Sequence, residues 1–158
     1  MFGSGKSFTS VEICAGGGGQ ALGLEKAGFS HQAVVEIDPD ACNTLRLNRE
    51  GSWNILEQNV HEFDGSAYED VDLFAGGVPC PPFSIAGKQL GPEDERDLFP
   101  RALELIQQIK PRAVMLENVK GLGQKRFDSY RASIIHRLNE LGYEAFWELI
   151  PVSYTHLR

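Results

Sequence analysis

The sequence is poor in cysteine, in long apolar runs and in positive charge, and each deficit excludes a class of protein. Its three cysteines, Cys14, Cys42 and Cys80, are an odd number and lack the spacing of a zinc site. They predict free thiols in a reducing, cytoplasmic compartment rather than a disulfide-stabilised secreted protein. The apolar runs are too short to span a membrane, and the first ten residues lack the apolar core of a signal peptide.

Positive charge is the second deficit. Lys and Arg number 15 against 22 Asp and Glu, which gives a net charge of −7. Phosphate contacts favour basic side chains, so this balance argues against a broad nucleic-acid surface on these 158 residues. Either nucleic acid is not the partner, or the basic surface is local or absent from this stretch. The length and the 42% hydrophobic content suit one soluble, globular domain.

Short apolar strands alternate with helical patterns along the whole chain. This order predicts an α/β fold with a mostly parallel sheet, helices on both faces and no internal domain boundary. Strands are expected around Val11 and Ile13 and over residues 31–37, 71–77, 112–119 and 143–152. Helices are expected over residues 21–27, from Pro39 onward, and over 97–109 and 126–142. The polar stretch 88–96 has the composition of a mobile lid.

A glycine-rich turn, Gly16 to Gly19, follows the first strand and opens the first helix. Backbone N–H groups at such a turn can face a ligand, and glycine allows a close approach. Glu36 ends the next strand, where an acidic residue accepts hydrogen bonds from ribose hydroxyls. The turn does not match GxGxxG, so the pattern favours an adenosine cofactor other than a dinucleotide; the alternative is a structural turn with a solvated Glu36.

Two further patterns lack the context that a site requires. The stretch "GSGKS" resembles the end of a phosphate-binding loop, but no strand precedes it and the earlier glycine is missing. The four histidines show no metal-ligand spacing, so no metal site is expected. Cys42 falls in a predicted helix and is expected to be a core thiol.

The segment "GGVPCPPFS" holds Cys80 between prolines, just after a predicted strand. Glu117 ends another predicted strand. Because the carboxyl ends of parallel strands meet at one edge of the sheet, the two side chains are expected to converge. A thiolate with a nearby carboxyl group suits attack on a polarised ring carbon. Taken singly, each residue has a structural alternative: a buried thiol for Cys80 and an ion pair for Glu117.

Four motifs together closely resemble the C5-cytosine DNA methyltransferase family. They are, in chain order, "EICAGGGGQALGLEKAGF", "EIDPDA", "GGVPCPPFSIAGKQ" and "ENVKGL". The resemblance covers roughly residues 8–150 and is most specific in Pro-Cys-x-x-Phe-Ser followed by Glu-Asn-Val. It implies a Rossmann-like S-adenosylmethionine-dependent methyltransferase fold whose C-terminal part is missing, and a single, partial catalytic domain without the target-recognition domain.

The resemblance also implies a reaction. Cys80 attacks C6 of a cytosine flipped out of double-stranded DNA, and Glu117 holds N3, so that C5 accepts the methyl group. Ser84, Asn118 and Val119 are implied as substrate-binding residues. The family's function is DNA methylation, as in restriction–modification, in a cytoplasmic, nucleoid-associated bacterial or phage-like setting. The full-length protein is expected to be a monomer with no membrane partner.

The cofactor implied by the resemblance is S-adenosylmethionine. The positions that match the family's cofactor pocket fall in the glycine turn, at the end of the second predicted strand, at residues 59 and 60, and before the nucleophile. They are Cys14, Ala15, Gly16, Gly18, Gly19, Glu36, Ile37, Asn59, Val60, Gly77 and Pro79.

The chain departs from the family pattern in three places. Cys14 replaces a phenylalanine, and Asn59 replaces an aspartate that contacts the adenine. After "FWELIPV" the chain ends at "SYTHLR", where the family continues into its recognition domain. We therefore expect a truncated gene or a non-native tail from about residue 152, and an isolated chain with little or no activity.

Three rival functions remain open at this point. A tRNA cytosine-5 methyltransferase shares the same motifs. A non-catalytic, cofactor-binding remnant would have lost the reaction, although both Cys80 and Glu117 are retained. A nicotinamide-dependent oxidoreductase explains the glycine turn but neither "PCPPFS" nor "ENV".

Overall fold

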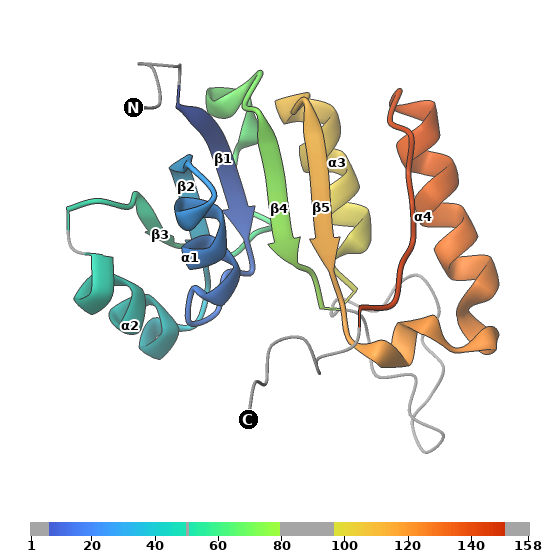
Figure 1. The fold of residues 1–158 in the computed structure, drawn as a ribbon, viewed down its shortest axis with the longest axis horizontal. Helices are drawn as coiled ribbons and strands as arrows, with labels where there is room; N and C mark the ends of the chain where they lie inside the picture. The colour runs from blue at the N-terminus through green and yellow to red at the C-terminus, as the bar shows by residue number, and fades with distance from the viewer. Residues whose placement is uncertain (1–6, 50, 80–96, 151–158) are drawn as a thin grey trace. The chain divides into compact units, whose positions relative to one another are not determined.

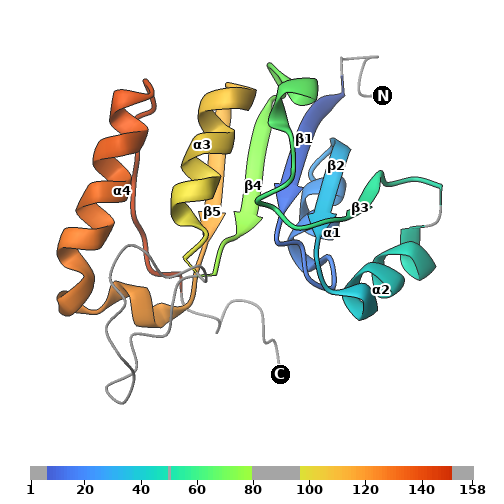
Figure 2. The same cartoon turned by 180° about the vertical axis from the view of Figure 1, so that it is seen from behind.

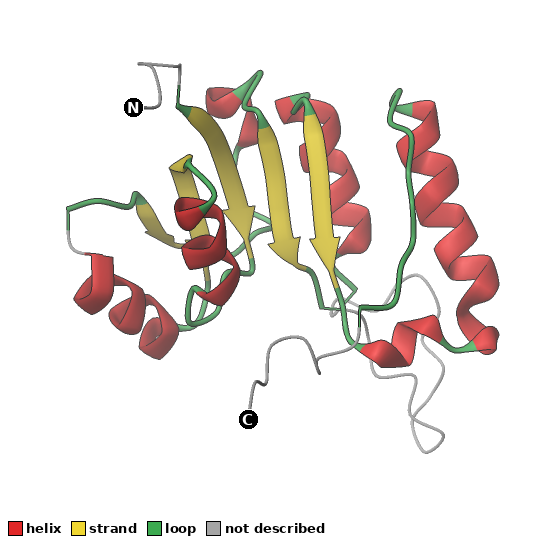
Figure 3. Ribbon diagram, in the orientation of Figure 1, coloured by secondary structure: helices red, strands yellow, loops and turns green. Residues whose placement is uncertain are grey.

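The computed structural model describes residues 7–49, 51–79 and 97–150. Five strands and four α-helices are assigned within these ranges (Figures 1 and 3). The strands are β1 Phe8–Ile13, β2 Phe29–Glu36, β3 Ile55–Glu57, β4 Leu73–Gly77 and β5 Ala113–Glu117. The helices are α1 Gly19–Lys26, α2 Pro39–Arg49, α3 Phe99–Ile109 and α4 Asp128–Glu140. Short 3-10 turns cover Gly65–Tyr68, Lys120–Gly123 and Lys125–Phe127.

The strands form one parallel sheet, as the alternating pattern predicts. Its order is β3-β2-β1-β4-β5, and every neighbouring pair runs parallel. The chain moves outward from β1 to β3, then returns to the other side of β1 for β4 and β5. Helix α1 covers one face and α3 covers the opposite face (Figures 1 and 2). The order reverses between β1 and β4, so a crevice is expected at their carboxyl ends.

Helices α1 and α2 are bounded by the residues that the sequence marks as helix ends, although α1 begins two residues earlier than expected. Gly18 precedes α1 with φ +84°, and a Cβ at this position would lie 2.5 Å from Leu45 Cδ2, so only glycine fits. Gly28 follows α1 with φ +96° and ends that helix. Asp38 caps α2 by accepting hydrogen bonds from the N–H groups of residues 40 and 41, both at 2.9 Å, with Pro39 in the first position.

The core lies on both faces of the sheet. On the α1 face, Leu24 packs against Leu73 and Ala75 of β4. Near the sheet edge, Leu45 of α2 packs with Ala15 and Val34. Helix α3 carries Pro100 in its first turn and buries one apolar stripe, made of Phe99, Ala102, Leu105, Ile106 and Ile109. Burial of about 1.5–3 kcal/mol per large apolar side chain makes this packing the main support of the sheet.

Two expectations about strands differ from the structure. Strand β3 was not expected, because three residues between a polar loop and Asn59 give too little pattern to detect. The strand expected over 143–152 is wrong for its described part: residues 143–150 form neither helix nor strand. Phe146 and Ile150 in this segment are 83% and 74% exposed, so the apolar pattern there does not mark burial. The lid expected over 88–96 lies outside the described residues.

The chain divides into two compact units, residues 1–118 and 119–158. In the second unit, the predicted helix is present as α4, and Ile134 is its buried apolar residue. Arg131 donates hydrogen bonds to the carbonyls of Leu122 (2.6 Å) and Gln124 (3.0 Å) and lies 5.5 Å from the ring of Trp147, so it holds the turn before α4. Over the described ranges, no helix has the length and apolarity to cross a membrane.

Candidate cofactor and catalytic site

A cavity of about 450 Å³ lies at the carboxyl ends of the central strands. Its lining comes from β1 and the residues that follow it, from α1, and from the ends of β4 and β5. The described residues that line it are Glu12, Cys14, Ala15, Gln20, Gly77 and Glu117. The cavity therefore opens where the strand order reverses, which is the position at which open α/β sheets bind ligands.

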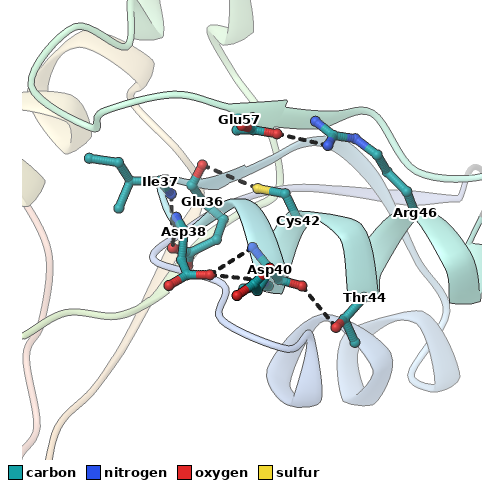
Figure 4. A network of polar contacts seen from close by, with 9 residues as sticks. Glu36, Ile37, Asp38, Asp40, Cys42, Thr44, Arg46 and Glu57 are labelled. Carbon is teal, nitrogen blue, oxygen red and sulfur yellow. Dashed lines mark hydrogen bonds and ion pairs between the residues drawn. The ribbon is translucent and has the colours of Figure 1, made fainter.

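Glu36 holds the glycine turn in place. Its carboxylate accepts hydrogen bonds from the N–H groups of Gly16 (2.7 Å), Ile37 (2.8 Å) and Asp38 (2.9 Å). The side chain is 8% exposed, and Figure 4 shows it at the junction of β2 and α2. Two carboxylate oxygens have about four acceptor positions, so one remains for a ribose hydroxyl. Glu36 therefore stabilises the glycine turn, in addition to the ribose-binding role predicted for it.

The residues after Glu36 form a polar network (Figure 4). The Cys42 thiol donates to the Glu36 carbonyl at 3.5 Å and is fully buried, which agrees with a core thiol. Arg46 pairs with Glu57 at 2.7 Å across α2 and β3. Ile37 is 61% exposed and lies beside this network, and its predicted contact with adenine stays a prediction.

Asn59 and Val60 lie in the turn that follows β3. The Asn59 side-chain carbonyl accepts a hydrogen bond from the His61 N–H at 3.0 Å, which leaves its second lone pair for the adenine contact that the sequence predicts. Arg101 of α3 donates to the carbonyls of Val60 (3.1 Å) and Phe63 (2.7 Å). Arg101 thereby fixes this turn, a role that sequence inspection missed because the contact joins residues far apart in the chain.

The segment that leads to Cys80 is anchored on both sides. The Asn118 side chain donates to the Val78 carbonyl at 2.5 Å, and the Leu98 N–H donates to the Pro79 carbonyl at 3.2 Å. A Cβ on Gly77 would lie 3.6 Å from the Cys14 carbonyl and from Glu117 Oε2. The Glu117 carboxylate therefore reaches the end of β4, directly before the nucleophile segment.

Cys14 lines the cavity but is not suited to be a nucleophile. Burial, together with the nearby Glu36 charge, raises the pKa of its thiol to about 12. At neutral pH this thiol is protonated, and a protonated thiol is a poor nucleophile. Its backbone has φ +53°, because the chain turns sharply out of β1 into the glycine turn.

Glu12 is the site residue that the sequence analysis did not single out. It lies in the central strand, is 0% exposed, and its two carboxyl oxygens have no hydrogen-bond partner among the described residues. Burial raises its pKa to about 7, and the nearby Ala21 N–H, which does not form a well-aligned hydrogen bond with the carboxyl group, opposes this rise only in part. Gln20 Oε1 is also buried without a partner. A charged residue inside an apolar strand was the available signal.

The structure brings together part of the predicted site. Cys14, Ala15, Gly77 and Glu117 line one cavity, and Gly16 is bonded to Glu36 at its margin. The turn glycines Gly18 and Gly19 open α1. Cys80 and Ser84 lie outside the described residues, and Val119 belongs to the second unit. Their places in the site stay predictions.

Comparison with known proteins agrees with these motifs. Residues 8–155 match the family described as C-5 cytosine-specific DNA methylase. The type II methyltransferase M.NgoMIV of Neisseria gonorrhoeae is 59% identical over 143 residues, which cover 90% of this chain and 46% of that protein. M.NaeI of Lentzea aerocolonigenes is 53% identical over 152 residues, which cover 94% of this chain and 36% of that protein.

Solved structures support the same assignment. A DNMT2 variant from Spodoptera frugiperda is 25% identical with a TM-score of 0.66, over 85% of this chain and 41% of that one. The fold is the Rossmann-like fold of S-adenosylmethionine-dependent methyltransferases, as predicted. The chain spans less than half the length of these relatives. The match over residues 8–155 includes every described motif, and the chain belongs to the C-5 cytosine-specific DNA methylase family.

Proposed function

We propose that this chain carries the cofactor site and the catalytic residues of a methyltransferase that modifies C5 of cytosine in double-stranded DNA. The observation that carries the proposal is that Cys14 and Ala15, which lead into the glycine turn, and Glu117 line one cavity at the strand-order reversal. The segment that continues into Cys80 starts at the same place, because Gly77 lines that cavity. The type II methyltransferase relatives favour a role in restriction–modification and a cytoplasmic location.

The cavity fits S-adenosylmethionine, which supplies a methyl group on a sulfonium when bound. Cys14 and Ala15 line the cavity just before the glycine turn, and Glu36 and Asn59 each keep an acceptor position for a ligand. Glu12 and Gln20 add buried acceptors without partners. In this arrangement Glu36 binds ribose, Ile37 packs on adenine, and Asn59 with Val60 meets the adenine edge. The turn residues and Pro79 complete the pocket.

The chemistry assigned to the chain needs a thiolate and a carboxyl group. The Cys80 thiolate forms a bond to C6 of the flipped cytosine, and the electron pair of the C5–C6 double bond moves into the ring. Glu117 holds N3, which stabilises the charge that develops there. C5 then takes the methyl group, the C5 proton leaves to a base, and the bond from C6 to the Cys80 sulfur breaks to regenerate the thiolate.

Asn118 supports this step by positioning. Its bond to the Val78 carbonyl ties the end of β5 to the backbone two residues before Cys80. Prolines on both sides of Cys80 restrict the backbone further. Restricting the nucleophile lowers the entropic cost of reaching the attack geometry. Ser84 and Val119 are proposed to contact the DNA substrate.

The proposal is tested by covalent capture. DNA duplexes that contain 5-fluorocytosine are incubated with the chain and S-adenosylmethionine, because fluorine cannot leave C5 as a proton does, so the adduct accumulates even when turnover is slow. Because the isolated chain is expected to have little activity, we expect only a small fraction of the chain to form a denaturation-resistant protein–DNA adduct; its modified peptide contains Cys80, and Cys80→Ala forms none.

The other results point to the rival functions. An adduct on fluorinated tRNA but not on duplex DNA would favour the tRNA methyltransferase. Binding of S-adenosylmethionine without any adduct would favour a non-catalytic cofactor-binding chain, and binding of a nicotinamide cofactor in its place would favour an oxidoreductase.

A further inference from the structure

Positive charge is scarce in this chain, but it is concentrated after β5. Residues 120–137 hold five of the 15 Lys and Arg and only one of the 22 Asp and Glu. Three of these cations lie on the two 3-10 turns that precede α4, here called the basic turn, residues 120–127 (Figure 1). They are Lys120, Lys125 and Arg126, and all three are exposed. The local basic surface that the composition left open is therefore present in the second unit.

The acidic side chains that follow in the chain are paired with other arginines. Asp128 pairs with Arg131, and Glu140 pairs with Arg137 at 3.0 Å. Within the described part of the chain, no acidic side chain pairs with the three cations of the basic turn. A solvated protein surface normally mixes charges of both signs. Like charges on neighbouring residues repel one another, so this grouping costs free energy that a bound anion would offset.

The basic turn holds its cations on a fixed backbone. Arg131 donates hydrogen bonds to the carbonyls of Leu122 and Gln124 inside the turn. The side chains of Leu122 and Phe127 are buried and anchor the turn on its inner side. Arg126 lies 4.7 Å from the Phe127 ring, a cation–π contact that orients its guanidinium. An oriented cation loses less conformational entropy on binding than a freely moving one.

The outer side of the basic turn suits a phosphate backbone. Residues 123–126 are exposed in a row, and a Cβ on Gly123 would meet nothing within 4 Å, so the space beside them is open. Lysine and arginine are the side chains that proteins use to bind phosphate. Lys120 follows Glu117 by three residues, which span at most about 11 Å. DNA whose flipped cytosine meets Glu117 therefore has its backbone within reach of the turn.

We propose that Lys120, Lys125 and Arg126 bind phosphates of the DNA duplex beside the flipped cytosine. The inference rests on the proposed function, which supplies the duplex and directs its target base to Glu117. Contacts with phosphates read no base edge, so the basic turn contributes affinity and orientation but no target sequence. Each neutralised phosphate releases condensed counterions, so this contribution falls as the salt concentration rises.

The test measures how salt changes DNA binding by the 158-residue chain. The affinity for a fluorescently labelled DNA duplex is measured by anisotropy between about 50 and 200 mM salt. The logarithm of the binding constant falls with the logarithm of the salt concentration, with a slope of about −0.9 for each phosphate contact. The double variant Lys125→Gln/Arg126→Gln should make this slope less steep by about 1.8 and weaken binding about sixtyfold at about 0.1 M salt.

Two matched variants separate phosphate binding from other effects. Lys26→Gln/Lys110→Gln removes the same two charges where α1 and α3 lead back to the amino ends of β2 and β5. It should leave the slope unchanged and the affinity within about twofold of the wild type, because charges farther away than a Debye length are screened. Lys125→Arg/Arg126→Lys alters both side chains but keeps both charges, and it should retain the wild-type slope.

The inference and the proposed function fail in different ways. If the wild type binds no duplex at the lowest salt concentration, or if Lys125→Gln/Arg126→Gln keeps the wild-type slope, the phosphate-binding role is refuted. Saturable binding of S-adenosylmethionine by the same samples would still support the proposed function. A loss of affinity for tRNA with unchanged affinity for the duplex also refutes the inference. If the slope changes as expected but the chain neither binds S-adenosylmethionine nor forms an adduct, the proposed function fails and the basic turn stands as a DNA-binding surface.

Discussion

Glu12→Gln should stabilise the free protein, and the gain should grow with pH. The pKa of Glu12 rises from an ordinary 4.5 to about 7 in the folded state. The folded state thus binds more protons than the unfolded state between these values, so stability is lost as pH rises from about 4.5 to 7. At 1.36 kcal/mol per pKa unit, the full penalty is about 3 kcal/mol, reached above pH 7.

Glutamine removes this penalty because it cannot ionise. Integrated over the titration, the variant should exceed the wild type by about 1 kcal/mol at pH 5 and about 3 kcal/mol at pH 8. His31, whose pKa burial lowers, works in the opposite sense: its neutral, buried ring costs stability as pH falls below 6.5. Because His31 is common to both proteins, the difference between them isolates Glu12.

Urea unfolding at pH 5, 6, 7 and 8 measures this difference without any ligand. The chain has two tryptophans, one in each unit, so a Trp147→Phe background makes the fluorescence report Trp53 in the first unit. A variant that is less stable than the wild type at pH 8, or a difference that is flat with pH, would show that Glu12 has a partner in the free protein and would refute the reasoning.

Three further predictions follow from the geometry. Gly18→Ala should lower the free energy of unfolding by about 2 kcal/mol, because φ is +84° and the new methyl group meets a side chain, whereas Gly17→Ala, with nothing within 4 Å, should be near neutral in the same urea assay. Asn118→Ala removes the hydrogen bond to the Val78 carbonyl and should slow adduct formation on fluorocytosine DNA at least tenfold. The affinity for S-adenosylmethionine should stay within about twofold of the wild type. Equal effects on adduct formation and on affinity would contradict a positioning role. The His31 ring should titrate by NMR with a midpoint below 6.5, because burial lowers its pKa, and a midpoint at that value or higher would contradict this.

The sequence was sufficient to predict the parallel sheet and the ends of its helices, because the patterns that mark them involve only neighbouring residues. Glycine at a positive φ, as at Gly18 and Gly28, and the Asp38–Pro39 cap each require only neighbouring residues. The parallel sheet followed from the alternation of strands and helices. The rule that parallel strands share their carboxyl edge placed Glu117 at the end of β5, beside Gly77 at the end of β4, and its convergence with Cys80 stays a prediction.

The contacts that the sequence did not reveal join residues that are far apart in the chain and meet only in the folded structure. Arg101 meets the Val60 carbonyl across 41 residues, and Asn118 meets the Val78 carbonyl across 40. Glu12 was hidden because an isolated acid in a strand usually faces solvent, and only burial on both sides of β1 makes it exceptional. The strand expected over 143–152 rested on apolar content alone, and in its described part, residues 143–150, Phe146 and Ile150 are exposed rather than packed in a core.

The most direct test of the cofactor site is calorimetric titration of the 158-residue chain with S-adenosylmethionine. Glu36→Gln is the informative variant, because Glu36→Ala would also remove the acceptor for the Gly16 N–H and loosen the turn. The account predicts saturable one-to-one binding that weakens in Glu36→Gln and stays unchanged in Glu25→Gln. A wild-type chain that is folded by circular dichroism and binds no S-adenosylmethionine would contradict it.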